Sequence, residues 1–245
     1  MLKHVNIMGI PFINLTKHNL LKRVLNSKTN KTFIVTANPE IVMYTRTSEQ
    51  YRSSINKADY IVADGIGIIL ASKWLKQPLP ERIAGFDLML SMIEHAENNK
   101  KSCYFLGASE SVNQKAIKKL KVMFPNLIIA GHHHGFFDLN DEKVVEIVKS
   151  SNADLVFVAL GMPKQEQWIA KNIDSFSKGI FMGVGGSFDV VAGEVKRAPD
   201  IWIKLNLEWL YRLIKQPFRW KRVVKVFEFM FLIVFNRINN NSNLK

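Results

Sequence analysis

Residues 32–40 read TFIVTANPE. A run rich in β-branched and aromatic residues leads here into a proline, which is common in the first turn of a helix and rare inside a central strand. The stretch therefore predicts a buried strand over 32–37 that passes directly into a helix. A strand without polar alternation is typical of a parallel sheet that is covered on both faces.

The same change from strand to helix recurs through the first 195 residues. Further apolar runs predict strands at 60–63, 102–106, 127–130, 154–160 and 179–184. Apolar residues recur near helical spacing in 109–123, with Ser109 as its N-cap and Pro125 beyond its end, and in 138–150, with Asp138 at its start. Strands that alternate with helices predict an α/β fold with a mainly parallel sheet flanked by helices.

Composition narrows the class of protein further. The chain has 245 residues, of which 47% are hydrophobic, so it can bury a sizeable core. Its one cysteine, Cys103, cannot form an intrachain disulfide, and no Cys/His group has structural zinc spacing. The N-terminal stretch lacks the apolar region of a signal peptide. We therefore expect a cytoplasmic protein.

The positive charge is concentrated at the C-terminal end. Residues 196–245 hold eleven Lys and Arg against three acidic residues, a net charge of +8 out of the +13 of the whole chain. Three of the five tryptophans lie in the same segment, and its longest apolar run, Phe229–Phe235, is far too short to span a bilayer. Aromatic residues beside cations are typical of a helix that lies in the plane of a membrane surface.

The order of residues in this tail predicts two helices. Pro199 and Asp200 begin the first, and Pro217 separates it from the second run, 219–235. In the first helix, a polar stripe would hold Lys204, Glu208, Arg212 and Lys215. The alternative to membrane contact is a pair of helices packed on the core or on a neighbouring subunit.

Polar residues follow two of the predicted strands, at the edge where ligands bind in open α/β sheets. Thr36 and Asn38 lie at the end of the first strand, although capping of the next helix explains Asn38 equally well. Asp64 follows the strand at 60–63, and its carboxylate is suited to accept a proton from a substrate hydroxyl. Aspartate is also a common N-cap, so either role fits this residue taken alone.

Two further candidates are an arginine and a pair of glycine-containing turns. Arg82 precedes a helix that begins near Gly85, and an arginine beside this edge can bind a diphosphate with two hydrogen bonds. Gln165 lies in the first of the turns, ALGMPKQEQWI (159–169). The second, GVGGSFDVVAG (183–193), is also a glycine-containing turn from a strand into a helix. Neither turn matches the dinucleotide fingerprint or the Walker pattern. The adjacent residues His132–His134 are poorly spaced to share one metal ion.

The motifs together resemble those of the WecG/TagA/CpsF glycosyltransferase family. The resemblance covers roughly residues 5–220 and rests on TANPEIV (36–42), ADGIGI (63–68), ERIAGFDL (81–88), FLGAS (105–109), GHHHGFF (131–137), ALGMPKQEQWI (159–169) and GVGGSFDVVAGEVKRAP (183–199). It implies a Rossmann-like catalytic core, here 1–195, and a basic helical appendage, 196–245, that contacts the membrane.

The resemblance also implies a reaction. An N-acetylmannosamine unit would pass from UDP-N-acetylmannosamine to undecaprenyl-diphosphate-N-acetylglucosamine with inversion, as in wall teichoic acid synthesis. Asp64 would be the base, Thr36 and Asn38 would line the pocket, and Arg82 and Gln165 would contact phosphates and sugar. Arg212, Arg219 and Arg222 are candidates to bind the departing diphosphate. The chain has no DxD motif, so we expect no metal ion or other cofactor.

Alternatives remain within and outside this enzyme class. Within it, the donor could instead be UDP-N-acetylmannosaminuronic acid or UDP-glucose, serving another surface polysaccharide. Outside it, a basic module could bind nucleic acid or anionic lipid without catalysis. We disfavour nucleic acid because much of the charge lies in a tail with long apolar runs. We expect a peripheral protein at the inner face of the plasma membrane, and the possibility of a homo-oligomer stays open.

Overall fold

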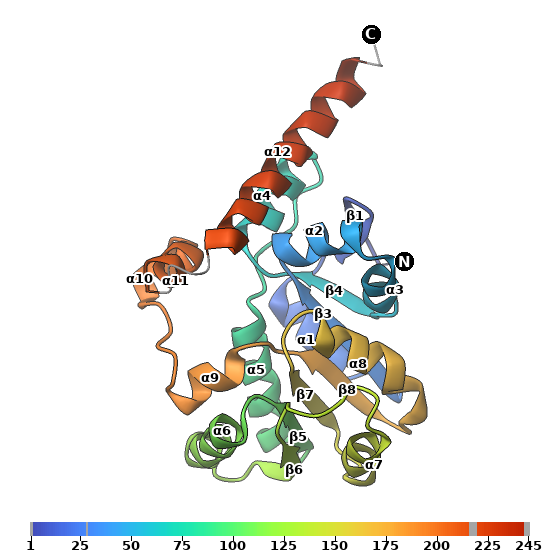
Figure 1. Ribbon diagram of the computed structural model, residues 1–245, viewed down its shortest axis with the longest axis vertical. Coiled ribbons are helices and arrows are strands. Elements are labelled where there is room, and N and C mark those ends of the chain that lie inside the picture. Colours follow the sequence, from blue (N-terminus) through green and yellow to red (C-terminus); the bar gives the residue numbers. More distant parts are fainter. Residues whose placement is uncertain (1, 28, 216–219, 243–245) are drawn as a thin grey trace.

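The central sheet contains the six strands that the sequence predicts. The computed structural model describes residues 2–27, 29–215 and 220–242, and the side chains of Arg212, Lys221, Arg222 and residues 236–242 also lie outside the description. All six strands are parallel, in the order β4-β3-β8-β7-β5-β6 (Figure 1). Their bounds are β3 (Lys31–Ala37), β4 (Tyr60–Ala63), β5 (Ser102–Gly107), β6 (Ile128–His133), β7 (Leu155–Ala159) and β8 (Gly179–Gly183).

Helices cover both faces of the sheet, which explains continuous apolar runs such as LVFVA in β7. The edge strand β6 (IIAGHH) is less apolar and only partly buried. One face packs against α1 (Lys17–Leu25), α5 (Gly85–Asn98), α6 (Glu110–Met123) and α9 (Ser187–Ala192). The other packs against α2 (Pro39–Thr47), α3 (Glu49–Asn56), α4 (Ile66–Trp74), α7 (Glu142–Ser150) and α8 (Lys164–Asn172), which the short 3-10 helix Ile173–Ser175 follows. Alternate residues of each strand enter the two hydrophobic clusters, as Ile34 and Val35 do in β3.

Two predicted helix starts have different outcomes. Ser109 caps α6 as predicted, because its hydroxyl accepts a hydrogen bond from the Val112 amide. The prediction that a helix begins at Asp138 is wrong. The Asp138 side chain accepts from the Asn140 amide and closes a turn, and Asp141 caps α7 instead.

A two-stranded antiparallel hairpin precedes the sheet and was not predicted. It consists of β1 (His4–Ile7) and β2 (Ile10–Ile13), joined through Met8 and Gly9. Both turn residues have positive φ, 54° and 87°, the backbone conformation of a tight two-residue hairpin turn. Val5 and Ile7 alternate with exposed residues and enter the core, so a period-two signal is present but only four residues long.

Within its described residues, the tail forms three helices rather than two. They are α10 (Asp200–Lys204), α11 (Glu208–Lys215) and α12 (Trp220–Ser242). The helix start at Pro199 and Asp200 is confirmed, but the single polar stripe is wrong, because the chain breaks at Asn206 with φ 60°. Lys204 and Glu208 therefore belong to different helices. Within the described ranges, no helix is long and apolar enough to cross a membrane.

The last helix packs against the core beside α2 and α4 (Figure 1). Phe229 and Ile233 are buried in the same hydrophobic cluster as α2, α4 and the strands they cover. Beyond them, α12 extends away from the sheet (Figure 1). The division of the chain at residue 195 stays a prediction.

Candidate active site

A cavity of about 430 Å³ lies at the carboxyl ends of β3 and β4. Because these two strands are parallel neighbours, with Thr36 beside Val62 and Ala37 beside Ala63, the residues that follow them meet at one edge. The core contributes Thr36, Asn38, Glu40, Asp64, Arg82 and the turn after β8. The tail contributes Asn206, Glu208, Trp209, Leu213, Val223, Val226, Phe227 and Met230. The cavity is thus formed jointly by the sheet edge and the tail.

Asp64 is anchored at this edge by the backbone of two other elements. Its amide donates to the Ala37 carbonyl, and its Oδ2 accepts from the Gly85 amide at 3.1 Å, at the first residue of α5. A Cβ on Gly85 would lie 2.9 Å from Thr36 Oγ1 and 3.4 Å from Asp64 Oδ2, so this close approach requires glycine. Asp64 does not cap the helix that follows it, since Gly65 occupies that position.

Arg82 lies between two carboxylates. Its Nε donates to Asp64 Oδ1 at 3.4 Å and its Nη2 to Glu208 Oε2 at 2.9 Å. The Arg82 side chain is only 16% exposed. Burial on its own lowers the pKa of Arg82, but Asp64 and Glu208 outweigh burial and raise it above its usual value. The guanidinium is therefore a fixed positive charge beside the Asp64 carboxylate.

Asn38 has both of the roles that the sequence left open. Its Oδ1 accepts from the Ile41 amide at 3.0 Å, so the residue caps α2. The same residue lines the cavity beside Thr36 and Asp64. The capping interpretation is confirmed, and the cavity position leaves its substrate role as a prediction.

Gln165 lies behind the cavity rather than in its lining. The side chain is buried; its Oε1 accepts from the Gly185 amide at 2.9 Å, and its Nε2 donates to Glu166 Oε1 at 2.6 Å. It thereby joins the start of α8 to the turn after β8, and Gly186 and Ser187 of that turn do line the cavity. In this structure, the effect of Gln165 on the cavity is exerted through the turn.

Glu166 continues this network into the core. Its Oε2 accepts from the Tyr51 hydroxyl at 3.1 Å, and the carboxyl is almost fully buried. Burial raises the pKa of Glu166 to about 7, although the bonds from Gln165 and Tyr51 oppose that rise. Burial, and then Glu166, raise the pKa of Tyr51, so its hydroxyl stays protonated. Sequence reasoning missed both residues.

Two other charged residues of the cavity were also missed. Arg197 forms an ion pair with Asp87 through two contacts of 2.7 Å, and its guanidinium carbon lies 4.8 Å from the centre of the Phe86 ring. Glu208, from the tail, is buried against Arg82. Its one local signal is that it is one of three acidic residues in a segment with eleven basic ones. The predicted residues Arg212, Arg219 and Arg222 have side chains outside the described part of the chain.

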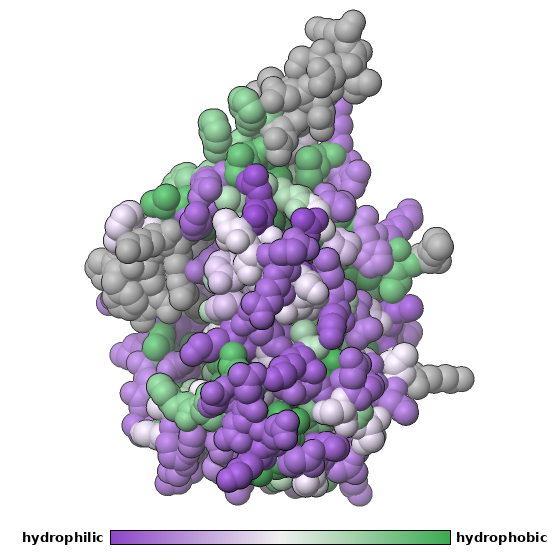
Figure 2. Space-filling model, turned by 45° about the vertical axis from the view of Figure 1, so that its right-hand side comes forward, coloured by the Kyte–Doolittle hydropathy of each residue, from purple (hydrophilic) through white to green (hydrophobic). Residues whose placement is uncertain are grey.

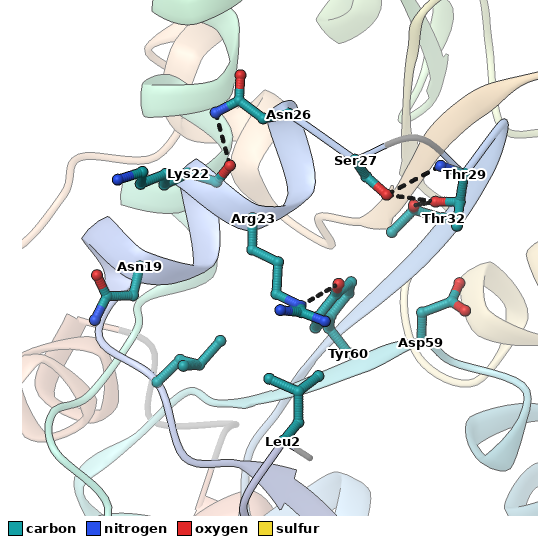
Figure 3. Close-up of a pocket in the computed structure, with 11 residues that line it drawn as sticks. Leu2, Asn19, Lys22, Arg23, Asn26, Ser27, Thr29, Thr32, Asp59 and Tyr60 are labelled. Atoms are coloured by element: carbon teal, nitrogen blue, oxygen red, sulfur yellow. Dashed lines mark hydrogen bonds between the residues drawn. The ribbon is translucent and has the colours of Figure 1, made fainter.

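A second cavity, of about 600 Å³, lies at the opposite ends of the same strands (Figure 3). It is larger, but it is open and lies beside the starts of β3 and β4. Several of its polar side chains bond to each other or to the backbone: Arg23 donates to the Tyr60 hydroxyl, and Asp59 accepts from the Phe33 amide. We therefore take the first cavity, where polar groups converge on open space, as the candidate active site.

A metal site finds no support in the described residues. Nowhere among them do three His, Cys, Asp or Glu side chains gather as a metal ion requires. In the histidine run, His133 contacts the His134 carbonyl through Nδ1 at 2.8 Å, and the two rings lie 4.4 Å apart. The expectation that no cofactor is needed stays a prediction.

Comparison with known proteins agrees with this geometry. The family described as "Glycosyl transferase WecG/TagA/CpsF family" matches residues 5–243. Relatives from Staphylococcus aureus strains MW2 and NCTC 8325 / PS 47 are each 45% identical to this chain over 223 residues. The match covers 89% of this chain and 86% of each relative. Both carry the name N-acetylglucosaminyldiphosphoundecaprenol N-acetyl-beta-D-mannosaminyltransferase. The chain belongs to the WecG/TagA/CpsF family of glycosyl transferases.

Proposed function

We propose that this protein transfers N-acetylmannosamine from UDP-N-acetylmannosamine to undecaprenyl-diphosphate-N-acetylglucosamine, forming the β-linked disaccharide lipid of wall teichoic acid synthesis. The name of the similar Staphylococcus aureus proteins supports this acceptor and this sugar. The observation that carries the proposal is the position of Asp64, whose carboxylate lies beside Arg82 in a cavity at the sheet edge. A base and a cation in one cavity are what displacement of a diphosphate by a hydroxyl requires.

Asp64 acts as the general base in a single displacement. Its carboxylate accepts the proton of the acceptor hydroxyl while that oxygen attacks the anomeric carbon. The bond from this carbon to the UDP oxygen breaks on the opposite face, and the electron pair leaves with UDP. One displacement at the anomeric carbon converts an α-linked donor into a β-linked product. The proton then passes from Asp64 to water.

The leaving diphosphate needs positive charge on its side of the cavity. Arg82 lines the same cavity with its charge intact, and the tail arginines Arg212, Arg219 and Arg222 are further candidates to bind the diphosphate. Together they would stabilise UDP without a divalent ion. Activity should therefore persist in excess EDTA, measured against an untreated sample; loss that Mg²⁺ restores would contradict a metal-free reaction.

The tail provides contact with the membrane that holds the acceptor. Large apolar side chains are exposed along it, among them Trp220, Phe227 and Phe231, which are 56%, 65% and 66% exposed. Figure 2 shows hydrophobic residues gathered where the tail meets the core. Together with the net charge of +8 in residues 196–245, this surface suits an in-plane helix on an anionic bilayer. A peripheral position at the inner face would bring the cavity to a lipid-linked acceptor.

Vesicle sedimentation tests the membrane proposal. The full chain should pellet with vesicles that contain anionic phospholipid, and less so in high salt, because screening weakens attraction to the lipid headgroups. A chain that ends at residue 195 should remain in the supernatant and lose transfer activity. Equal pelleting of the two chains, both checked for folding by circular dichroism, would show that the tail is not the membrane-binding segment.

Competition between donors tests the sugar. The protein is supplied with a polyprenyl-diphosphate-N-acetylglucosamine acceptor and radiolabelled UDP-N-acetylmannosamine, and unlabelled rival donors are added in excess. We expect unlabelled UDP-N-acetylmannosamine to suppress the labelled product. UDP-N-acetylmannosaminuronic acid and UDP-glucose should have little effect. Preferential transfer from either rival would overturn the N-acetylmannosamine assignment.

A further inference from the structure

Glu208 is a buried acid in the most basic part of the chain. It is the first residue of α11, it is 6% exposed, and it contacts Arg82, which lies 126 positions earlier. Burying a carboxylate is costly unless a charged or hydrogen-bonding partner is buried with it. The tail therefore places a negative charge inside the active-site cavity, where it is paired with the buried Arg82 guanidinium.

The contacts of Arg82 show how this charge acts. The guanidinium reaches Glu208 at 2.9 Å but Asp64 only at 3.4 Å, so its shorter contact is with the tail. A cation in close contact with a carboxylate stabilises the ionised form and makes it a weaker base. By holding Arg82 at the longer distance, Glu208 limits this effect on Asp64. The negative charge of Glu208 also disfavours the ionised form of Asp64, and it thereby makes Asp64 a stronger base.

We propose that Glu208 is a positioning residue: it holds the Arg82 guanidinium between two carboxylates, and it thereby keeps Asp64 basic enough to accept the proton of the acceptor hydroxyl. This inference rests on the proposed function, in which Asp64 is the base. Asp64 and Arg82 belong to the core, and Glu208, the second carboxylate partner of Arg82, belongs to the tail.

Other charged groups face the same cavity, so the test must separate the effect of Glu208 from theirs. Glu40 comes from α2, and Arg197 comes from the segment before α10. Of the described cations, Arg82 contacts Asp64 directly, whereas Arg197 is engaged with Asp87. The Gly85 amide, at the start of α5, donates to Asp64 as well. Substituting Glu208 changes the partner of Arg82 and leaves these other groups in place.

The direct test is the titration of Asp64 in the full chain with and without Glu208. The protein is labelled with ¹³C at aspartate carboxyl carbons, and the Asp64 signal is assigned by its loss in Asp64→Asn. In Glu208→Gln, which keeps the side-chain length but removes the charge, Arg82 should move fully to Asp64. We expect the pKa of Asp64 to fall by about one unit relative to the wild type. An unchanged pKa would overturn the proposal.

Two further variants guard against a merely structural effect. Glu208→Asp retains the charge and should keep the pKa of Asp64 closer to the wild-type value than Glu208→Gln does. Glu228→Gln removes an exposed acid of α12 that pairs with Lys225, and it should leave the Asp64 titration unchanged. An equal shift in all three variants would show a general loss of acidic charge and would overturn the specific role of Glu208.

The rate of transfer supplies the functional readout. In Glu208→Gln, the acid limb of the kcat/KM profile should move to lower pH and the plateau should fall about tenfold, because a weaker base accepts the proton less readily. A lower plateau with an unmoved acid limb would indicate only a structural role and would overturn the proposal. A wild type with no transfer would contradict the proposed function instead, and the Asp64 titration would still decide the role of Glu208.

Discussion

Asn38 illustrates how one residue can serve the fold and the site together. Its side-chain oxygen caps α2, and the residue also lines the cavity beside Asp64. Aspartate caps a helix as well as asparagine does, whereas alanine cannot. The two roles can therefore be separated by comparing substitutions that affect them differently.

Asn38→Ala should lower the free energy of unfolding by about 1 kcal/mol, because the Ile41 amide loses its acceptor. Asn38→Asp should keep that stability but lower kcat at least about tenfold, since a new negative charge would face Asp64 and Glu40 and the incoming diphosphate. Urea denaturation and initial rates measure the two effects. Full activity in Asn38→Asp would restrict Asn38 to its capping role.

Glu166 makes stability depend on pH. Its pKa in the folded protein is about 7, against an ordinary value of 4.5, so the folded state retains a proton that the unfolded state has lost between these values. Its contribution to stability is therefore present below about pH 4.5 and is lost as pH rises to about 7. The loss amounts to about 3 kcal/mol.

Glu166→Gln cannot titrate, so it should not show this loss. Urea denaturation between pH 4.5 and 8 gives the free energy of unfolding of both proteins. We expect the difference between wild type and variant to shift in favour of the variant as pH rises through that window. A difference that stays constant with pH would show that Glu166 does not carry a proton in the folded state near neutral pH.

Among the elements, α12 has one face that is buried against the core and another that is exposed. Phe229 is completely buried against the core, whereas Phe231, two residues later on the same helix, is 66% exposed. Replacing a buried phenylalanine by alanine costs about 3–5 kcal/mol, and replacing an exposed one usually costs less than about 0.5 kcal/mol. The pair is a matched test because the residue type, helix and substitution are the same.

Phe229→Ala should release α12 from the core, which increases hydrogen exchange in residues 220–235 and lowers transfer activity. Phe231→Ala should leave exchange unchanged but weaken binding to anionic vesicles, since it removes apolar area from the side that we propose faces the membrane. Hydrogen exchange and vesicle sedimentation distinguish the two. If both variants behave alike in exchange, the packing of α12 on the core is not what the structure indicates.

The elements differ in how far local sequence determines them. The six strands of the sheet were predictable because each contains an apolar run, and the runs of the inner strands are covered on both faces. The β1–β2 hairpin was not, because its signal is only four residues long on each side of the turn. The break at Asn206 was also missed, since an asparagine inside a helical pattern is not by itself a stop signal.

At the scale of the whole molecule, the part of the site that could be predicted is the part built by parallel strands. Thr36, Asn38 and Asp64 lie at or just after the ends of neighbouring strands, so topology alone brings them to one edge. Glu208 and Arg197 arrive from the tail, and no local pattern shows that its helices dock over that edge. Gln165 lies behind the cavity, where its side-chain oxygen accepts a hydrogen bond from the Gly185 amide.

We propose that sugar transfer takes place at this joint cavity with Asp64 as the base. The most direct measurement is the initial rate of disaccharide-lipid formation by the wild type and by Asp64→Asn. The asparagine retains an oxygen that can accept from the Gly85 amide, so folding should be preserved, but an amide cannot take up the proton. We expect the rate to fall at least about 100-fold in a variant with an unchanged circular dichroism spectrum and unfolding midpoint. A folded Asp64→Asn variant that works within a few-fold of the wild-type rate would contradict the account.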